Sequence, residues 1–472
     1  MATTINLRKL LHRKQVEMCS PCPVGSGIGT FFRFLEVPAY GIKFGVGVTA
    51  LNQQWMYSPD EDAWQLLPAS ASAGTFGACA CGHISPIGPS ATATGGTTAT
   101  ILTALTLNHD LRGYKVRITA GPAAAGAELT ILSNTLGANA AITVATQGAA
   151  FTAATTFTLL TPRFWYFCPS ATAPGFNVYD WAQNTWTARA VTGLPTAWTI
   201  DARMTGTPGI KGGVYESQVG KTIGTCTATT VVTTAGAAWT VNQWANSQIR
   251  VTGGTGAGQI RTIASNTSNT LTVAALTTAL DATSTWVIEG NDDAIYLLGN
   301  NSVNLYKYSV AGNSWSTIAP GVVRAGAPGT ACSSDWISSC SDSDWADTSS
   351  IHNGRYIYSF RGAGGSLLDV YDIALNAWRA CFYGNQGEGM TTGSSYEYDA
   401  DSIYIQQVGQ RIFRFNLITN RLEPLHTLSY TNGTAVVGDK LFVATYNDGA
   451  TVLKWLYIMR NSATELFRLM LY

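Results

Sequence analysis

The stretch Tyr308-Ser-Val-Ala-Gly-Asn-Ser-Trp315 decides how this chain folds, because its pattern recurs along the sequence. In the full copies an aromatic residue is followed seven positions later by Trp, and Asn or Asp often stands two positions before the Trp. The alternating run Asn304-Leu-Tyr-Lys-Tyr precedes this copy, and Gly312 and Asn313 lie between its two aromatic residues. Alternation at period two around a Gly and Asn turn predicts a β-hairpin. The copies are Tyr57 to Trp64, Tyr179 to Trp186, Tyr308 to Trp315, Tyr371 to Trp378, and two degraded ones, Phe415 to Leu422 and Met459 to Leu466.

Several copies have a further alternating strand upstream, such as Ala294-Ile-Tyr-Leu-Leu-Gly and Ser402-Ile-Tyr-Ile-Gln. Each unit therefore comprises three or four short antiparallel strands, which is the makeup of one blade of a β-propeller. Trp378 and Leu422 are 44 residues apart, and so are Leu422 and Leu466. This interval matches the ~40 to 50 residues of a propeller blade. We predict an all-β fold with a roughly six-bladed β-propeller.

The first two intervals between copies, 122 and 129 residues, each leave room for an additional domain. The two additional segments resemble each other: Lys115-Val-Arg-Ile-Thr matches Gln248-Ile-Arg-Val-Thr, and Ala141-Ile-Thr-Val-Ala matches Thr270-Leu-Thr-Val-Ala. Alternating β-branched residues separated by Ser-Asn-Thr and Gly turns predict a small β-sandwich or barrel. The expected division is an N-terminal docking arm (1–30), blade 1 (31–90), insert 1 (91–163), blade 2 (164–220), insert 2 (221–290) and blades 3 to 6 (291–472).

The Tyr-Asp-x-x-x-Asn-x-Trp copies resemble the kelch repeat, whose blades carry such a Tyr and Trp. Kelch blades also carry a double Gly, which only Gly364-Gly365 supplies convincingly here. The inserts resemble β-modules that recur in bacteriophage tail and neck proteins, and a propeller with such inserts resembles the nozzle proteins of short-tailed phages. The resemblance implies a structural component of a virion, in the tail, nozzle or neck. Its partners would be other virion proteins and copies of itself, with a ring as one arrangement.

The composition agrees with assembly and excludes other classes. Only 12% of residues are charged, 28 basic against 28 acidic, while 46% are hydrophobic. This argues against disorder and against a basic stripe for nucleic-acid recognition. No stretch approaches the ~18 apolar residues of a membrane span. Charged and apolar residues interleave at the N-terminus, so we expect no secretory signal, synthesis in a host cytoplasm and localisation in the virion.

Catalytic motifs are missing from the sequence, and we expect neither an enzyme nor a cofactor. A copper oxidase of the kelch type needs two His and a Tyr at the propeller axis. Only His352 and His426 lie in blade sequence, and both fit loop or turn positions better. The Gly-rich stretch from Gly253 to Gly258 lacks the Lys-Ser/Thr of a phosphate-binding loop and matches a turn in insert 1.

The nine Cys leave three interpretations open. Cys19 and Cys22 form one close pair, and Cys79 and Cys81 form another. The two pairs could make a zinc site, although their spacing is atypical. Disulfides formed after release from the cell are a second interpretation, and free or buried thiols, which we favour, are the third.

Two further segments are candidate interaction sites. The stretch from Asp335 to Asp347 carries four Asp among serines, together with Trp336 and Trp345. We interpret it as a solvated loop, with a calcium site or a sugar site that stacks glycans on Trp as alternatives. The sugar site would make the protein a glycan-binding adhesin or receptor-binding protein of the virion, with a host surface glycan as partner. This is the alternative function.

The segment from Leu7 to Met18 stands apart from the β-rich remainder. Its apolar residues Leu7, Leu10 and Leu11 share one face at helical spacing. We therefore predict a short N-terminal helix that docks on a neighbouring subunit.

Overall fold

The structure is a computed structural model, and every regular element in its described part is a strand. No helix long and apolar enough to cross a membrane occurs among these residues. The described residues are 16–21, 31–37, 42–48, 54–58, 61–67, 81–85, 87–168, 174–196, 202–206, 214–233, 236–290, 293–299, 303–323, 336–339, 356–360, 367–382, 395–399, 402–407, 411–417, 419, 421–427, 440–447, 452–459 and 465–471.

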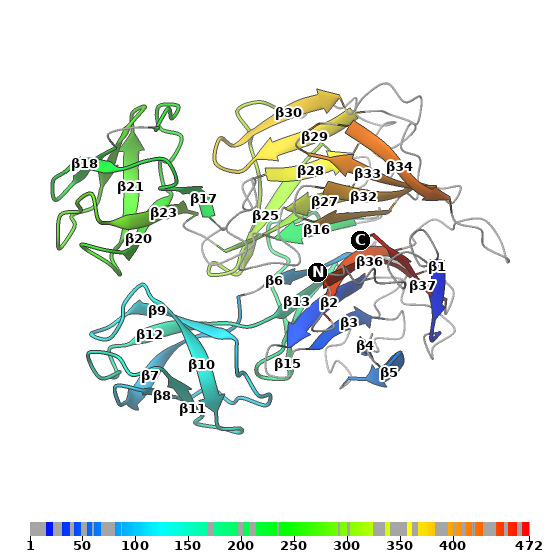
Figure 1. Ribbon diagram of the computed structural model, residues 1–472, viewed down its shortest axis with the longest axis horizontal. Helices are drawn as coiled ribbons and strands as arrows, with labels where there is room; N and C mark the ends of the chain where they lie inside the picture. Colours follow the sequence, from blue (N-terminus) through cyan, green and yellow to red (C-terminus); the bar gives the residue numbers. More distant parts are fainter. Residues whose placement is uncertain are drawn as a thin grey trace, which may run out of the picture.

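Six four-stranded antiparallel sheets form the blades of a β-propeller (Figure 1). From the innermost strand outwards, blades 1 to 3 are β2 (Phe31–Val37), β3 (Ile42–Val48), β4 (Gln54–Ser58), β5 (Ala63–Leu66); β6 (Cys81–Ser85), β13 (Arg163–Cys168), β14 (Gly175–Asp180), β15 (Thr185–Ala188); and β16 (Ala202–Gly206), β24 (Ala294–Gly299), β25 (Leu305–Ser309), β26 (Ser314–Thr317). Blades 4 to 6 are β27 (Trp336–Ser339), β28 (Tyr356–Phe360), β29 (Leu367–Asp372), β30 (Ala377–Phe382); β31 (Ser395–Asp399), β32 (Ser402–Gln407), β33 (Arg411–Asn416), β34 (Arg421–Thr427); and β35 (Lys440–Asn447), β36 (Val452–Met459), β37 (Leu466–Met470), β1 (Val16–Cys19).

The innermost strands close a ring. Each of β2, β6, β16, β27, β31 and β35 contacts the next, and β35 contacts β2. Blade 6 combines both ends of the chain, because β1 pairs with β37 in the register Val16↔Leu469 and Cys19↔Leu466. This pairing joins the last blade to the start of the sequence and completes the six-bladed propeller.

Strand β1 corrects the predicted N-terminal helix. The helix was expected to run to Met18, whereas Val16 to Met18 are part of β1 and pair with β37. Edge strand β37 offers unpaired backbone groups, and a strand satisfies them where a helix cannot. Helical periodicity reports only neighbours along the chain and does not detect this partner. Leu7, Leu10 and Leu11 lie outside the described residues.

The blade boundaries also differ from those expected, because each insert follows the innermost strand of a blade. The predicted boundaries place β6 in blade 1 and β16 in blade 2, yet these are the innermost strands of blades 2 and 3. The degraded copy from Met459 to Leu466 joins β36 to β37, the second and third strands of blade 6. The other five copies join third to fourth strands.

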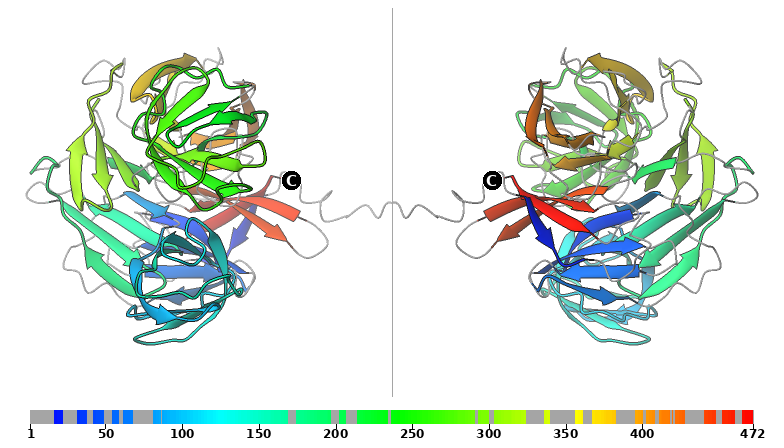
Figure 2. Two further views of the ribbon diagram at one scale, coloured as in Figure 1. Left: turned by 90° about the vertical axis from the view of Figure 1, so that its left-hand side faces the viewer. Right: turned by 90° about the vertical axis from the view of Figure 1, so that its right-hand side faces the viewer.

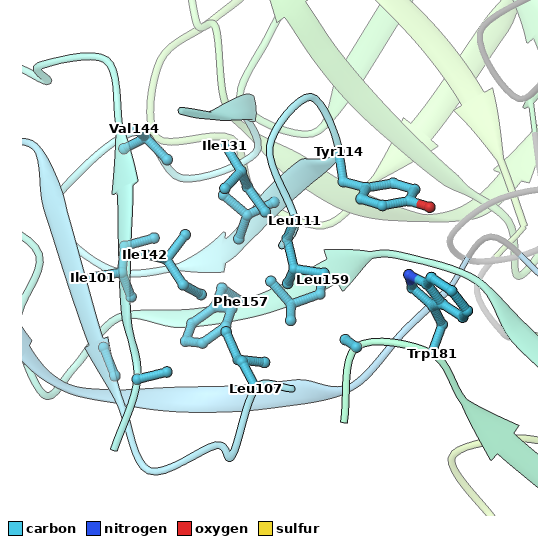
Figure 3. Close-up of a cluster of buried hydrophobic side chains, with 14 of the residues drawn as sticks. Ile101, Leu107, Leu111, Tyr114, Ile131, Ile142, Val144, Phe157, Leu159 and Trp181 are labelled. Atoms are coloured by element: carbon cyan, nitrogen blue, oxygen red, sulfur yellow. The ribbon is translucent and has the colours of Figure 1, made fainter. Parts of the chain in front are cut away.

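Insert 1 is a closed six-stranded barrel with an apolar interior. Ile101, Ile142 and Phe157 point into it, and its core continues to Trp181 of blade 2 (Figure 3). Around the barrel the strands are β10 (Glu128–Asn134), β11 (Ala141–Val144), β8 (Thr100–Thr103), β7 (Ser90–Gly96), β12 (Thr156–Leu160) and β9 (Lys115–Ala120).

Insert 2 has the same strand order, but its first strand is interrupted. In insert 1, β7 pairs with both β12 and β8. In insert 2 these two pairings are divided between β17 and β18, and Gln218 to Thr222 lie between them, so the sheet stays open. The expected division put β17 in blade 2, but it pairs with β23 of insert 2. The strands are β17 (Val214–Ser217), β23 (Thr285–Glu289), β20 (Gln248–Gly253), β21 (Ile260–Asn266), β22 (Thr270–Val273), β19 (Thr230–Thr233) and β18 (Ile223–Cys226).

Apolar clusters fill the spaces between neighbouring blades. Between blades 2 and 3, for example, Trp165 and Phe176 pack against Tyr308 and Trp315. Burying one such side chain contributes roughly 1.5–3 kcal/mol. Both inserts project from one side of this packed ring (Figure 1), and they lie next to each other (Figure 2).

Candidate assembly sites: interblade latches and paired inserts

The aromatic pairs of the repeat lie directly opposite each other on the third and fourth strands of their blades. The Tyr and Trp rings are 5.0 to 5.3 Å apart between centroids, in a tilted arrangement. The pairs are Tyr57↔Trp64, Tyr179↔Trp186, Tyr308↔Trp315, Tyr371↔Trp378 and Phe415↔Leu422.

The Asn or Asp two positions before the Trp has a specific role in blades 1 to 4, which the repeat pattern alone does not indicate. In blades 1 to 4 the Tyr hydroxyl donates a hydrogen bond of 2.6 to 2.7 Å to Oδ1 of this residue. The acceptor has a left-handed backbone, with φ between 46° and 54°, which Asn and Asp tolerate better than most residues. The acceptors are Asp62, Asn184, Asn313 and Asn376.

In blades 1, 3 and 4 the same Asn or Asp also forms a hydrogen bond with the segment that follows the preceding blade, and we call this contact the interblade latch. At blade 4, Asn376 Nδ2 donates to the carbonyl of Ala319 at 2.9 Å, and the Trp378 amide donates to the carbonyl of Val322 at 2.9 Å. At blade 3, the Ala190 amide donates to Asn313 Oδ1 at 3.2 Å. Each latch therefore ties one blade to the hairpin of the next.

Blade 1 has a latch that uses the N-terminal segment. The Ser20 amide donates to Asp62 Oδ1 at 2.8 Å, and Trp64 Nε1 donates to the Ser20 carbonyl at 2.8 Å. Burial raises the pKa of Asp62, but the hydrogen bonds from Tyr57 and Ser20 outweigh this and leave the pKa below its usual value. Burial raises the pKa of Tyr57, so the hydroxyl stays protonated and can donate. The latch at the closure of the ring is thus charge-assisted.

The two inserts contact each other through a buried ion-pair network. Arg117 of insert 1 donates from Nη1 to Glu289 Oε1 at 3.3 Å and from Nη2 to Oε2 at 3.2 Å. Arg250 of insert 2 donates to the same carboxylate from Nε at 3.0 Å and from Nη2 at 3.3 Å. Glu128 of insert 1 accepts from Arg117 at 2.8 Å. Two guanidinium groups therefore share two carboxylates across the contact between the domains.

The charged groups of this network are buried, so their pairing matters for the stability of the contact between the inserts. The Arg117 and Glu289 side chains are only 4% and 1% exposed. Burial lowers the pKa of Arg117, but the negative charges of Glu289 and Glu128 outweigh it and raise the pKa above its usual value. A buried charge that loses its partner is costly, so the network favours one relative position of the inserts. Arg117 and Arg250 occupy matching positions in the two related sequences.

Two glycines bring the insert backbones into contact beside the ion pairs. Gly126 and Gly258 occupy matching turns, with φ of 83° and 86°. A Cβ on Gly126 would overlap the backbone of Gly258, and a Cβ on Gly258 would overlap the carbonyl of Ala125. Only glycine allows this approach at these backbone angles.

Insert 1 also contacts blade 2 through its own loop. The His109 ring stacks on Trp181 with centroids 4.2 Å apart, and Asn108 Nδ2 donates to the Gln183 carbonyl at 2.6 Å. Burial lowers the pKa of His109, and its buried Nε2 has no hydrogen-bond partner. Insert 1 is therefore held from both sides, by blade 2 and by insert 2.

The structure describes only some of the Cys residues considered as metal or thiol sites. Within the described part of the chain, no group of three or more His, Cys, Asp or Glu side chains could hold a metal ion. Cys19 is buried in β1, and the backbone of Cys81 lies in β6. Cys22 and Cys79 are outside the described residues. Cys226, in insert 2, is a free thiol whose Sγ accepts from the Leu280 amide at 3.2 Å.

The expected loop from Asp335 to Asp347 begins with a strand. Trp336 is the first residue of β27 and pairs with Phe360, so it is not part of a loop. The propeller requires an innermost strand in blade 4, and this pairing across the sheet is not visible in the local Ser- and Asp-rich sequence. Asp335, Asp342, Asp344, Trp345 and Asp347 lie outside the described residues.

Comparison with known proteins finds no related sequence and only distant similarity to solved structures. No protein-family model matches the chain, and no curated protein matches its sequence. A chain in the crystal structure of the mitotic checkpoint complex is 8% identical, with a TM-score of 0.37 over 100% of this chain and 96% of that one. YCF48 bound to D1 peptide is 6% identical, with a TM-score of 0.33 over 99% and 96%. The ring of inner strands and the strand order define an all-β protein of the β-propeller class.

Proposed function

We propose that this chain is a structural subunit of a bacteriophage virion, in the tail, nozzle or neck, that acts by protein–protein assembly. The observation that carries the proposal is the contact between the two inserts. The network of Arg117, Glu289, Arg250 and Glu128 and the contact of Gly126 with Gly258 hold two related domains as one projection beside the propeller. A rigid projection of this kind is suited to presenting a fixed surface to a neighbouring subunit.

The closed ring supports the same proposal. The N-terminal strand β1 completes blade 6, and the Ser20–Asp62 latch joins blade 6 to blade 1. A propeller joined through its own terminus resists opening by force along the ring, because opening it requires loss of backbone pairing and of the latch together. A particle component under mechanical load benefits from such closure. The composition of 12% charged residues also agrees with surfaces that are covered in an assembly.

In this proposal the chain has no catalytic role and no cofactor. Its partners are other virion proteins and copies of itself, and it is made in the host cytoplasm before it enters the particle. Nucleic-acid sequence recognition has no part in it, in keeping with the formal net charge of zero.

Fractionation of particles tests the proposal. Lysate from cells that produce the protein is separated on a density gradient, and peptides from both inserts are quantified by mass spectrometry in each fraction. We expect the chain to sediment with intact particles at a fixed number of copies per particle, and a tag at the C-terminus to appear at one position in averaged electron micrographs. A chain that stays in the soluble fraction while other particle proteins sediment would show that it is not a virion component.

A further inference from the structure

A short loop of insert 1 connects the barrel to blade 2. The loop comprises residues 107–113, between β8 and β9, and we call it the His109 loop. The Asn108 amide donates to the Ala182 carbonyl at 2.9 Å, and Asn108 Nδ2 donates to the Gln183 carbonyl at 2.6 Å. Both carbonyls belong to the turn between β14 and β15 of blade 2. The loop is therefore bound to this turn through its backbone and through a side chain.

The His109 ring completes this contact, but one of its nitrogens has no partner there. The imidazole stacks on the Trp181 indole, with planes 10° apart and centroids 4.2 Å apart. Nε2 is buried and has no hydrogen-bond partner, and the Trp181 side chain, at the edge of the cluster in Figure 3, is only 5% exposed. A neutral imidazole can keep its single N–H on Nδ1 and leave Nε2 bare. An imidazolium carries N–H at both nitrogens, so the charged form buries a donor without an acceptor.

Insert 2 shows that the related module folds without this imidazole. In insert 1, Asn134 Nδ2 donates to the His109 carbonyl at 3.1 Å. In insert 2, the matching Asn266 donates from Nδ2 to the Thr240 carbonyl at 2.8 Å. Thr240 is exposed, so a small polar side chain is sufficient at this position of the module. The imidazole therefore serves the contact with blade 2.

The charged groups beside this contact, within the described residues, are already paired. On the loop, Asp110 and Arg112 form an ion pair at 2.6 Å. On blade 2, Asp180 adjoins the stacked indole in sequence and pairs with Arg163 at 2.7 Å. The other titratable side chains on the segments that pack against the loop are Tyr114 and Tyr179, which are uncharged in acid, and Glu128, which is bound to Arg117. Burial lowers the pKa of His109, and none of these charges opposes the shift.

We propose that the contact between the His109 loop and blade 2 is a pH switch, which opens when the His109 imidazole takes up a proton. Opening moves the loop off Trp181, lets Nε2–H donate to water and breaks the hydrogen bonds from Asn108. The indole face attracts a cation, but stacking on it buries Nε2–H without an acceptor, and this cost is the larger one. One proton is taken up, so the ratio of open to closed loop rises by at most about tenfold for each unit that the pH falls. The switch is a property of the fold and holds in any assembly that contains the chain.

Hydrogen exchange of the full chain tests the switch. Exchange is measured by mass spectrometry from neutral pH to about pH 5 and corrected for its intrinsic dependence on pH. We expect peptides that cover the His109 loop and the turn between β14 and β15 to lose protection in acid. The loss should reach up to about 30-fold near pH 5, the limit for an open loop whose imidazole has the ordinary pKa of 6.5. Peptides from β20 and β23 of insert 2, which contain no His, are the internal reference.

The decisive variant is His109→Phe, because it keeps an aromatic ring on Trp181 but cannot be protonated. Its loop should stay protected at every pH. The matched control is His426→Phe, which removes a different His, in β34 of blade 5, and should leave the acid response of the loop unchanged. Protection that does not change with pH in the unaltered chain, or that increases in acid, overturns the inference. An acid response that survives in His109→Phe also overturns it.

A second measurement uses only the unaltered chain. The His109 imidazole, followed by NMR, should titrate with a midpoint below its ordinary pKa of 6.5, and a midpoint at or above this value overturns the switch. Particle fractionation decides the proposed function separately, because the switch does not depend on it.

Discussion

Arg117 and Glu289 lie 172 residues apart in the sequence and form a bidentate ion pair across the contact between the two inserts. Each is almost fully buried, and each has a second partner of opposite charge, Glu128 for Arg117 and Arg250 for Glu289. Two positive and two negative side chains therefore lie together in a largely buried site. This relationship gives the paired inserts their specific geometry, and its loss should be measurable.

Glu289→Ala should destabilise the protein by about 3–5 kcal/mol, because it leaves the guanidinium groups of Arg117 and Arg250 without the carboxylate that they share. Urea unfolding followed by tryptophan fluorescence measures this change. The control is Asp110→Ala, which removes the exposed pair of Asp110 with Arg112 and should cost less than about 1 kcal/mol. Equal effects of the two substitutions would contradict a specific role for the buried network.

Gly258→Ala should separate the inserts, because the added Cβ overlaps the carbonyl of Ala125. Gly220→Ala is the matched control: its φ of 73° is also left-handed, but nothing lies within 4 Å of the added Cβ. Both substitutions carry similar backbone strain of about 1 kcal/mol. Only Gly258→Ala should increase hydrogen exchange in β9 and β20. Similar exchange in the two variants would show that the glycine contact does not hold the inserts together.

Tyr371→Phe should cost about 0.5–1.5 kcal/mol, since it removes the hydrogen bond to Asn376 while it keeps the ring against Trp378. A double-mutant cycle with Asn376→Gly separates this bond from other effects, because Gly tolerates the φ of 50° at that position. The double variant should lose less free energy of unfolding than the sum of the losses in the two single variants. Full additivity would mean that the hydroxyl and the amide act independently. Phe415 already occupies this position in blade 5, so the ring alone is compatible with the fold.

His109 should make stability depend on pH in mildly acidic solution. Burial against Trp181 lowers the pKa of His109 below its ordinary value of 6.5. The unfolded chain therefore binds a proton at a higher pH than the folded chain does. Stability should fall as the pH decreases through about 6.5 and level off below the lowered pKa of the folded state. Unfolding free energies measured between neutral and mildly acidic pH should show this decline, and His109→Gln should reduce it. An unchanged decline in the variant would assign it to other groups.

The sequence alone was sufficient for much of the propeller. The alternation of residues before Tyr308 and the turn at Asn313 are local signals, and the hairpins form where these signals predict them. The two inserts share a sequence pattern of apolar core positions, and strands with the same pattern fold alike. Ile142 and Leu271 occupy matching positions, and both are buried. The repeat pattern includes the Asn and Asp, but it does not indicate their hydrogen bond to the Tyr hydroxyl. The Arg at matching positions 117 and 250, in modules with few charges, was a signal that could have identified the contact between the inserts.

The sequence by itself determined the strands, the turns, the repeat of blades and the presence of two related inserts, because these follow from the conformations that each short stretch prefers. Only the tertiary structure decided which strands share a sheet. Val16 pairs with Leu469 and is not part of a helix. Strand β6 belongs to blade 2, although insert 1 separates it in sequence from the other strands of that blade. It also decided that Arg117 would neutralise Glu289. The physical reason is the same in each case. Backbone hydrogen bonds and ion pairs form only between groups that are close in space, and segments far apart in the sequence come close only when the blades pack into the ring.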